Sequence, residues 1–215
     1  QVSAKDYARC VADHACARTF KGRVNQPDQP VTGVSFNDAL AYARWLSQHT
    51  GYVWRLPTDP EWVYSAGVRF VDDDLGTAAD AADPSRRWLL KYARDTARKP
   101  QLASTVVAQR GTFGDNGLGL FDQSGNVWEW TSTCFTRSSL DQDGGVTSTD
   151  TVNCGVRVVE GRHRTYMSDF VQDAKSGGCA VGKPPEFLGF RLVREEPPQH
   201  SFDRLRVWLF SAINV

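Results

Sequence analysis

The sequence predicts an α+β domain with little regular secondary structure. Three observations support this class: helical patterns that begin at capping boxes, short runs of alternating apolar and polar residues, and glycine-rich turns between them. Seven tryptophans and eleven phenylalanines suit a compact, loop-rich core built on large rings. The 215 residues are enough for one sizeable domain. We expect this domain over 1–196 and a tail with the apolar run LRVWLF over 197–215.

The first helix is expected over Ser3–His14. Ser3 is followed three residues later by Asp6, which is the spacing of a capping box. His14 falls at helical spacing behind the apolar residues of this segment. We therefore interpret His14 as a helix-end residue and not as a ligand.

The clearest helix is expected over Ser35–His49. Ser35 and Asp38 form a second capping-box pattern. An apolar stripe at positions i, i+3, i+4 and i+7 is formed by Ala39, Tyr42, Ala43 and Leu46. Gly51 stands where a left-handed C-cap belongs.

A short strand over Val53–Leu56 is expected to lead into a third helix. Thr58 is the expected N-cap, Pro60 falls in the first turn, and Glu61 takes the capping-box position. We therefore expect structural roles for Glu61 and its neighbour Trp62.

The next segment is first acidic and then basic. Asp72–Asp83 could hold calcium through its first three aspartates, but no EF-hand spacing follows, and we expect a solvated loop. A further helix is expected from Asp83 to Pro100. The basic surface of this helix is either solvated or a wall for an anionic partner. Leu102–Val107 is expected to be a strand.

The chain is organised around the stretch GLGLFDQSGNVWEW, residues 117–130. Gly125 and Asn126 belong to a Ser-Gly-Asn turn, a kind of backbone that often needs positive φ. Trp128 and Trp130 alternate with Glu129, which predicts a strand with both indoles on one face and the carboxylate on the other. The pattern alone predicts a core hairpin with Glu129 exposed.

Shorter patterns surround this stretch. Leu118 and Leu120 alternate in the same strand-like way, and a polar loop follows Trp130. Gly155–Glu160 is expected to be a strand. Phe187–Val193 is expected to be the strand that closes the domain.

Composition and motifs exclude several functions. The 25 basic and 25 acidic residues balance, so bulk charge does not argue for nucleic acid or an anionic membrane. No run of about 18 apolar residues predicts a transmembrane helix. No glycine-rich dinucleotide fingerprint predicts a nicotinamide or flavin cofactor. The four histidines are scattered, which argues against a multi-histidine metal site.

Five cysteines leave the redox compartment open. Cys10 and Cys16 are close enough in sequence to close a small loop. Cys134 and Cys154 flank a polar insertion that they could staple, which would leave Cys179 over. Two disulfides would indicate an exported protein, which we favour, but five scattered thiols are also ordinary in a cytosolic protein.

Three segments, in order, resemble the formylglycine-generating-enzyme family, also called the sulfatase-modifying-factor domain. They are PVTGVSFNDALAYARWLSQHTGYVWRLPTDPEWVYSAG (30–67), GLGLFDQSGNVWEWT (117–131) and FLGFRLV (187–193). The resemblance implies a variant of the C-type lectin fold, with mixed helix and sheet and much irregular structure. Because Gln1 resembles a position inside the family's first helix region, we expect a leading strand and any targeting segment to lie outside this sequence.

The resemblance also implies a structural calcium site in the central stretch. The positions that match its ligands are the side chains of Asp122 and Glu129 and the backbone carbonyls of Gly125 and Val127. Hard oxygen donors from a tight turn and a strand suit calcium.

The family's catalytic cysteines do not carry over. Formylglycine-generating enzymes use a cysteine pair to bind copper, but the corresponding stretch, Val159–Cys179, holds a single thiol, so we expect no copper. Polar groups stand there instead: Arg162, His163, Arg164, Tyr166 and Asp169. Glu186 follows two prolines and is either a loop glutamate or a carboxylate with a raised pKa that acts as general acid or base.

Without the copper cysteines and with extra cysteines, the chain resembles periplasmic family members that mature the siderophore pyoverdine. The resemblance implies an oxidase that converts a catechol-bearing dihydro chromophore of a peptide-siderophore precursor to the fluorescent chromophore, with molecular oxygen as acceptor. Catalytic roles would fall to Glu186, His163, Tyr166 and Asp169, and substrate binding to Arg162, Arg164 and Trp128.

Two other functions stay open. One is a non-catalytic binding module of the C-type lectin type, with the loop Asp141–Thr149 among its contacts. The other is a related oxidase that acts on a sulfur substrate, in which Cys179 would be a reactive thiol. The sequence leaves an oligomer possible.

Overall fold

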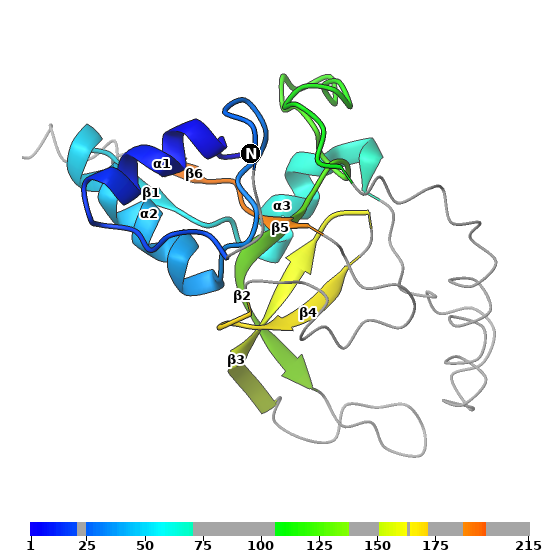
Figure 1. The fold of residues 1–215 in the computed structure, drawn as a ribbon. Helices are drawn as coiled ribbons and strands as arrows, with labels where there is room; N and C mark the ends of the chain where they lie inside the picture. Colours follow the sequence, from blue (N-terminus) through cyan, green and yellow to red (C-terminus); the bar gives the residue numbers. More distant parts are fainter. Residues whose placement is uncertain (21–24, 71–105, 138–150, 163, 172–186, 197–215) are drawn as a thin grey trace, which may run out of the picture.

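The computed structural model describes residues 1–20, 25–70, 106–137, 151–162, 164–171 and 187–196 (Figure 1). In chain order, its helices are α1 (Ala4–Ala12), α2 (Phe36–Thr50), α3 (Asp59–Ala66) and the 3-10 turn η1 (Gly67–Arg69). The strands are β1 (Val53–Arg55), β2 (Trp128–Arg137), β3 (Thr151–Glu160), β4 (Thr165–Ser168), β5 (Leu188–Gly189) and β6 (Val193–Glu195).

A four-stranded sheet with the order β4-β3-β2-β5 forms the centre of the described fold (Figure 1). Its two longest strands, β2 and β3, pair antiparallel as a hairpin, and β4 pairs antiparallel with β3. The short strand β5 pairs parallel with β2. Separately, β1 and β6 form a two-stranded antiparallel sheet. This mixture of helices, short strands and irregular segments confirms the predicted α+β class.

Two of the three expected capping boxes are present, at Ser35 and Thr58, and they explain where α2 and α3 begin. At α1 only half of the box forms: the Ser3 side chain accepts from the Asp6 N–H, but the Asp6 carboxylate accepts from the Ser3 hydroxyl and not from its backbone N–H. The Ser35 side chain accepts from the backbone N–H of Asp38, and the Asp38 carboxylate accepts from the backbone N–H of Ser35. Gly51 ends α2 in the left-handed conformation at φ 72°. Such reciprocal bonds satisfy helix-end donors locally, which is why the sequence could indicate these boundaries.

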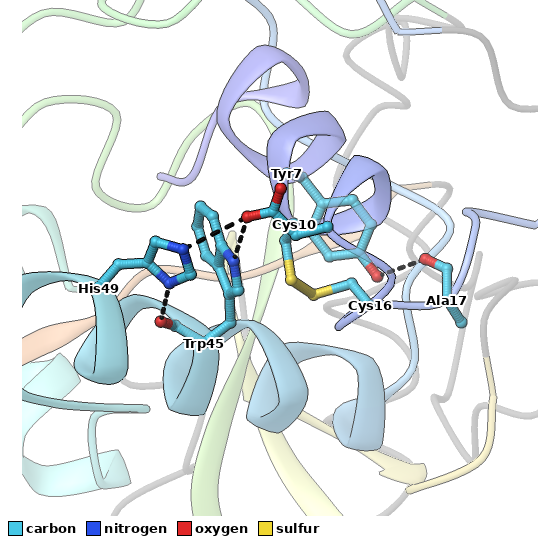
Figure 2. Close-up of a disulfide and its surroundings, with 7 residues drawn as sticks. Tyr7, Cys10, Cys16, Ala17, Trp45 and His49 are labelled. Atoms are coloured by element: carbon cyan, nitrogen blue, oxygen red, sulfur yellow. Dashed lines mark hydrogen bonds and ion pairs between the residues drawn. A yellow bond between two sulfur atoms is a disulfide. The ribbon is translucent and has the colours of Figure 1, made fainter.

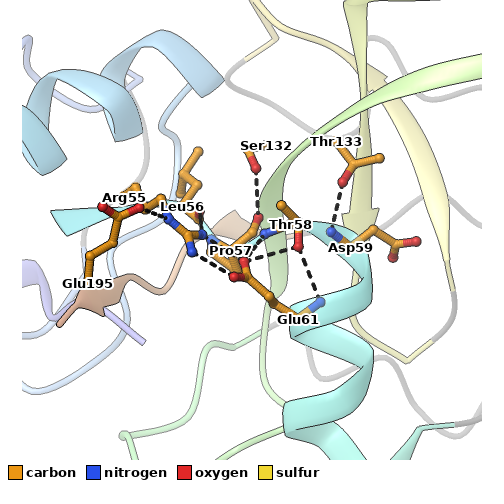
Figure 3. A network of polar contacts seen from close by, with 9 residues as sticks. All are labelled: Arg55, Leu56, Pro57, Thr58, Asp59, Glu61, Ser132, Thr133 and Glu195. Atoms are coloured by element: carbon orange, nitrogen blue, oxygen red, sulfur yellow. Dashed lines mark hydrogen bonds and ion pairs between the residues drawn. The ribbon is translucent and has the colours of Figure 1, made fainter. Parts of the chain in front are cut away.

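The start of α3 is held by a network of polar contacts (Figure 3). Thr58 and Glu61 form the expected capping box. Arg55 donates two hydrogen bonds of 2.6 and 2.7 Å to the Glu61 carboxylate and a third, of 2.6 Å, to Glu195. Glu61 therefore has the structural role expected of it, and Arg55 of β1 joins its helix α3 to β6.

The core between the helices and the sheet is built from aromatic rings. Tyr42 of α2 stacks on Tyr7 of α1 at 5.7 Å and meets Phe190 edge-on at 5.6 Å. Trp130 of β2 packs edge-on against Phe36 at 5.9 Å. All five of these side chains are buried, so the core joins residues that are far apart in the chain.

Both cysteine pairings that the spacing allowed are present. The Cys10–Cys16 disulfide closes the turn after α1, and Cys134–Cys154 joins β2 to β3. Figure 2 shows the first disulfide next to Trp45, whose indole N–H donates to Asp13 at 2.9 Å. The first disulfide therefore links α1 to the turn that follows it, and the second links the two strands of one hairpin.

Three expectations about strands need correction. Phe187–Val193 is not one strand, because β5 ends at Gly189 and β6 begins at Val193. The alternation of Leu118 and Leu120 does not indicate a strand either. Gly117 and Gly119 adopt positive φ there, and both leucines are exposed on a turn. Residues 106 and 107, the described end of a further expected strand, lie in irregular structure.

Several expected features lie outside the described residues. They are the acidic loop Asp72–Asp83, the helix from Asp83 to Pro100, the loop Asp141–Thr149 and the tail 197–215. None of the described helices has the length and apolar character that a membrane span requires.

Candidate functional site

The centre of the stretch 117–130 is a buried ion pair that the sequence pattern did not predict. Glu129 is 1 % exposed, so the expectation of an exposed carboxylate is wrong. Its two oxygens accept hydrogen bonds from the guanidinium of Arg191, including one of 2.8 Å. The Trp62 indole N–H and the Gln1 side-chain amide also donate to it, at 2.7 and 2.8 Å.

The backbone brings Arg191 to Glu129. Glu129 pairs with Gly189 in the parallel β2–β5 ladder, two residues before Arg191. A Cβ atom at Gly189 would lie 2.5 Å from the carbonyl oxygen of Val31, so only glycine fits this approach. Burial raises the pKa of Glu129, but the charge and hydrogen bonds of Arg191 outweigh it and hold the pKa below its ordinary value.

Most of the groups that match the family's calcium ligands already have other partners in this geometry. The side-chain oxygens of Asp122 accept from the backbone N–H groups of Gly111 and Phe113. Glu129 is already neutralised by Arg191, and the Gly125 carbonyl accepts from the Val127 N–H at 2.9 Å. A calcium ion needs several free oxygen donors, so this arrangement does not fit calcium. The calcium site that the resemblance implies would require the Glu129–Arg191 pair to open.

A second buried carboxylate lies directly across the hairpin from the first. Glu160 of β3 pairs with Glu129 of β2 and is 0 % exposed. Arg164 donates to one of its oxygens at 2.7 Å and contacts Asp59 of α3 at 3.0 Å. The other oxygen of Glu160 has no hydrogen-bond partner among the described residues.

This cluster favours a bound proton. Burial, followed by the neighbouring Asp59, raises the pKa of Glu160 to about 8, although Arg164 opposes the shift. Two carboxylates that share one arginine are stabilised when one of them is protonated. The cluster Asp59–Glu160–Arg164 therefore joins α3 to the β3–β4 edge through a carboxyl group whose pKa is raised by burial and by Asp59.

Arg164, for which substrate binding is predicted, contacts two carboxylates and an aromatic ring. The guanidinium is held by two carboxylates and lies 5.8 Å from the centre of the Phe70 ring. Its side chain is 31 % exposed. No local pattern in the sequence indicates Glu160 or Asp59, because Arg164 brings them together across 105 positions from Asp59.

The other predicted site residues are distributed along β4 and its surroundings. Tyr166 packs edge-on against Phe135 at 4.9 Å, and Arg162 is exposed. The backbone of Asp169 accepts from the Phe36 N–H and donates to the Gly155 carbonyl. Trp128, a predicted stacking surface, is 9 % exposed and packs closely on Gly161. His163, Glu186 and Cys179 lie outside the described residues.

A mixed domain with a capped Arg-Leu-Pro-Thr helix start, a Trp-Glu-Trp strand and a Gly-Phe-Arg partner defines one class of protein, the formylglycine-generating-enzyme type. Residues 1–196 match the sulfatase-modifying factor enzyme 1-like domain, and the chain belongs to this family.

Curated relatives place the chain among proteins of this type. It is 30 % identical over 185 residues to a formylglycine-generating enzyme of Streptomyces coelicolor, covering 79 % of this chain and 54 % of that protein. It is 31 % identical over 168 residues to the inactive C-alpha-formylglycine-generating enzyme 2 of Bos taurus, covering 73 % and 52 %. The chain thus spans about half the length of these relatives.

A solved structure shares the fold. The structure of PvdO from Pseudomonas aeruginosa superposes with a TM-score of 0.55 at 21 % identity, covering 91 % of this chain and 78 % of that one. At this identity the likeness concerns the fold.

Proposed function

We propose that this domain is an oxidase of the formylglycine-generating-enzyme family that acts without a copper-binding cysteine pair. The observation that carries this proposal is the state of the cysteines. Four of the five form the disulfides Cys10–Cys16 and Cys134–Cys154, which leaves only Cys179 as a source of thiolate. A copper(I) site needs more than one soft ligand, so the chemistry must use other groups.

The proposed substrate is the catechol-bearing dihydro chromophore of a pyoverdine-type siderophore precursor. Two electrons and two protons leave the dihydro ring, and molecular oxygen takes them up as hydrogen peroxide. Glu186 accepts a ring proton, while His163, Tyr166 and Asp169 orient the catechol or relay protons. A deprotonated catechol reacts readily with oxygen, so neither flavin nor nicotinamide is needed.

The described structure supports this proposal at two points. Arg164, directly before β4, binds a carboxyl cluster in which burial raises the pKa of Glu160, and Tyr166 lies two residues further along the chain, on β4. Perturbed carboxyl groups of this kind are frequent near functional sites. The two disulfides suit an oxidising compartment, and we propose the periplasm.

A non-catalytic binding module is the second candidate. Two observations favour it. The buried charges of Glu129 and Arg191 are paired with each other, as expected of structural groups. One relative is named as an inactive enzyme. In this case the domain would bind a peptide or another ligand without converting it.

The experiment is incubation of the purified protein with dihydropyoverdine in air, followed by chromophore absorbance. Wild type, Glu186→Gln and Tyr166→Phe are compared with Tyr64→Phe, a matched tyrosine change at an exposed position on α3. We expect fast oxidation by wild type and Tyr64→Phe and slow oxidation by Glu186→Gln.

Equal oxidation by wild type and Glu186→Gln would keep the enzyme but move the acid–base role to His163 or Tyr166. If no variant, including wild type, accelerates oxidation over buffer, the oxidase proposal is wrong and a binding module is the better account.

A further inference from the structure

The Cys134–Cys154 disulfide has a cation in contact with one of its sulfur atoms. It bridges β2 and β3 with a Cα–Cα distance of 4.5 Å. Arg157 lies opposite Cys134 in the antiparallel register. Its Nη1 donates to Cys134 Sγ at 3.0 Å and to the Ser132 carbonyl at 2.9 Å. The guanidinium therefore contacts Cys134 directly.

Arg157 lacks a full set of hydrogen-bond and charge partners. Its Nε is buried and has no hydrogen-bond partner among the described residues. The guanidinium lies 4.2 Å from the centre of the Phe36 ring, and no salt bridge to Arg157 is found in the described part of the chain. Burial lowers the pKa of Arg157, and the more distant charge of Asp169 compensates in part. A negative charge on Cys134 would supply the missing counter-ion.

The two sulfur atoms differ in accessibility. Cys154 belongs to an exposed part of β3, whereas Cys134 is half-buried beside Arg157. In thiol–disulfide exchange, a thiolate attacks the accessible sulfur, and the sulfur with the lower thiol pKa leaves more readily. A neighbouring arginine lowers a thiol pKa. Both factors select Cys154 for attack and Cys134 as the leaving group.

We propose that Cys134–Cys154 is a redox-responsive disulfide that exchanges with small thiols. The attacking thiolate forms a new S–S bond to Cys154, the Cys134–Cys154 bond breaks, and its electron pair goes to Cys134, which Arg157 holds as a thiolate. With a dithiol reductant, the second thiol resolves the mixed disulfide, so that the reductant is oxidised and Cys154 is released as a thiol. This inference is independent of the proposed oxidase activity.

The effect of exchange would be local. The pairs Glu129–Glu160 and Trp130–Val159 lie on the core side of the disulfide, separated from it by a register shift between Trp130 and Cys134. Phe135, directly after Cys134, packs on Tyr166. Reduction is therefore expected to loosen the outer half of the hairpin and the surroundings of Tyr166, while the core stays folded.

The Cys10–Cys16 disulfide is an internal control within the same molecule (Figure 2). Its cysteines are 0 % and 8 % exposed. Among the described residues, no arginine donates a hydrogen bond to either of these sulfur atoms. It should resist reduction under conditions that open Cys134–Cys154.

The test is equilibration of the full chain in glutathione redox buffers, followed by alkylation and mass spectrometry of each cysteine. We compare wild type with Arg157→Met and with Arg157→Lys, which retains the charge. We expect Cys134–Cys154 to be reduced before Cys10–Cys16, with glutathione trapped on Cys154. In Arg157→Met the equilibrium constant for reduction should fall about tenfold, or about 30 mV, and Arg157→Lys should recover part of this loss.

Circular dichroism identifies the variants that remain folded, and the Lys variant keeps the test valid if Arg157→Met does not fold. The proposal is overturned if Cys10–Cys16 opens as readily as Cys134–Cys154 or if glutathione is trapped mainly on Cys134. It is also overturned if wild type and the folded Arg157 variants share one equilibrium constant.

Discussion

Replacing Glu160 with glutamine is predicted to change how stability depends on pH. Burial and the neighbouring Asp59 raise the pKa of Glu160 from 4.5 to about 8. Between these two pH values the folded protein keeps a proton that the unfolded chain releases. Stability linked to Glu160 is therefore complete below pH 4.5 and is lost as the pH rises towards 8. At about 1.4 kcal/mol per pH unit, the loss approaches about 5 kcal/mol.

Glutamine keeps an oxygen that accepts from Arg164 but does not titrate. Urea unfolding between about pH 5 and 9 at constant ionic strength measures the free energy of unfolding of both proteins. Relative to wild type, Glu160→Gln should gain about 1.4 kcal/mol per pH unit until the folded-state pKa is passed.

A matched control is Glu61→Gln, at a carboxylate whose pKa is shifted the other way. Hydrogen bonds from Arg55 lower the pKa of Glu61 to about 2. Its stabilisation is thus present above pH 4.5 and lost as the pH falls towards 2. The difference between Glu61→Gln and wild type should stay constant from about pH 5 to 9. Parallel stability curves for wild type and Glu160→Gln in this range would refute the reasoning.

Three other predictions concern the central stretch. Glu129→Gln should lower the free energy of unfolding by about 3 to 5 kcal/mol, because it leaves Arg191 buried without a counter-ion. Adding Arg191→Met to this variant should restore part of the lost free energy, which a double-mutant cycle measures. A Cβ at Gly161 would lie 2.3 Å from the Trp128 ring, so Gly161→Ala should cost about 1 to 3 kcal/mol; an unchanged urea midpoint would contradict this packing. With Glu129 paired to Arg191, millimolar calcium should not change the thermal midpoint of wild type, and a rise that Glu129→Gln abolishes would show that calcium displaces the arginine.

Sequence reasoning succeeded where the determinants are local. The caps at Ser35 and Thr58 and the left-handed Gly51 each depend on residues within one helical turn, so their patterns are visible in the chain. The faces of β2 were also predicted, because alternation places Trp128 and Trp130 opposite Glu129 whatever their partners are.

It failed where the partner is distant in sequence. The alternation along a strand does not distinguish an exposed glutamate from a buried one. The counter-ion that accompanies the burial of Glu129 is Arg191, which lies 62 residues further along the chain. The closing segment was predicted as one strand because its apolar run does not show that Arg191 turns inward between β5 and β6. Asp59 and Glu160 gave no signal for the same reason. His163 and Glu186, on which the proposed chemistry depends, remain sequence-based predictions.

The contacts of α3 determine more than its position. Trp62 donates to Glu129, and Asp59 shares Arg164 with Glu160, so two bonds of fixed direction hold this helix to adjacent strands. Apolar packing alone tolerates small rotations of a helix about its axis, whereas hydrogen bonds weaken steeply when their angle changes. The rotation of α3 is therefore fixed at two points. A change in protonation at Glu160 would therefore act on the rotation of α3 about its axis.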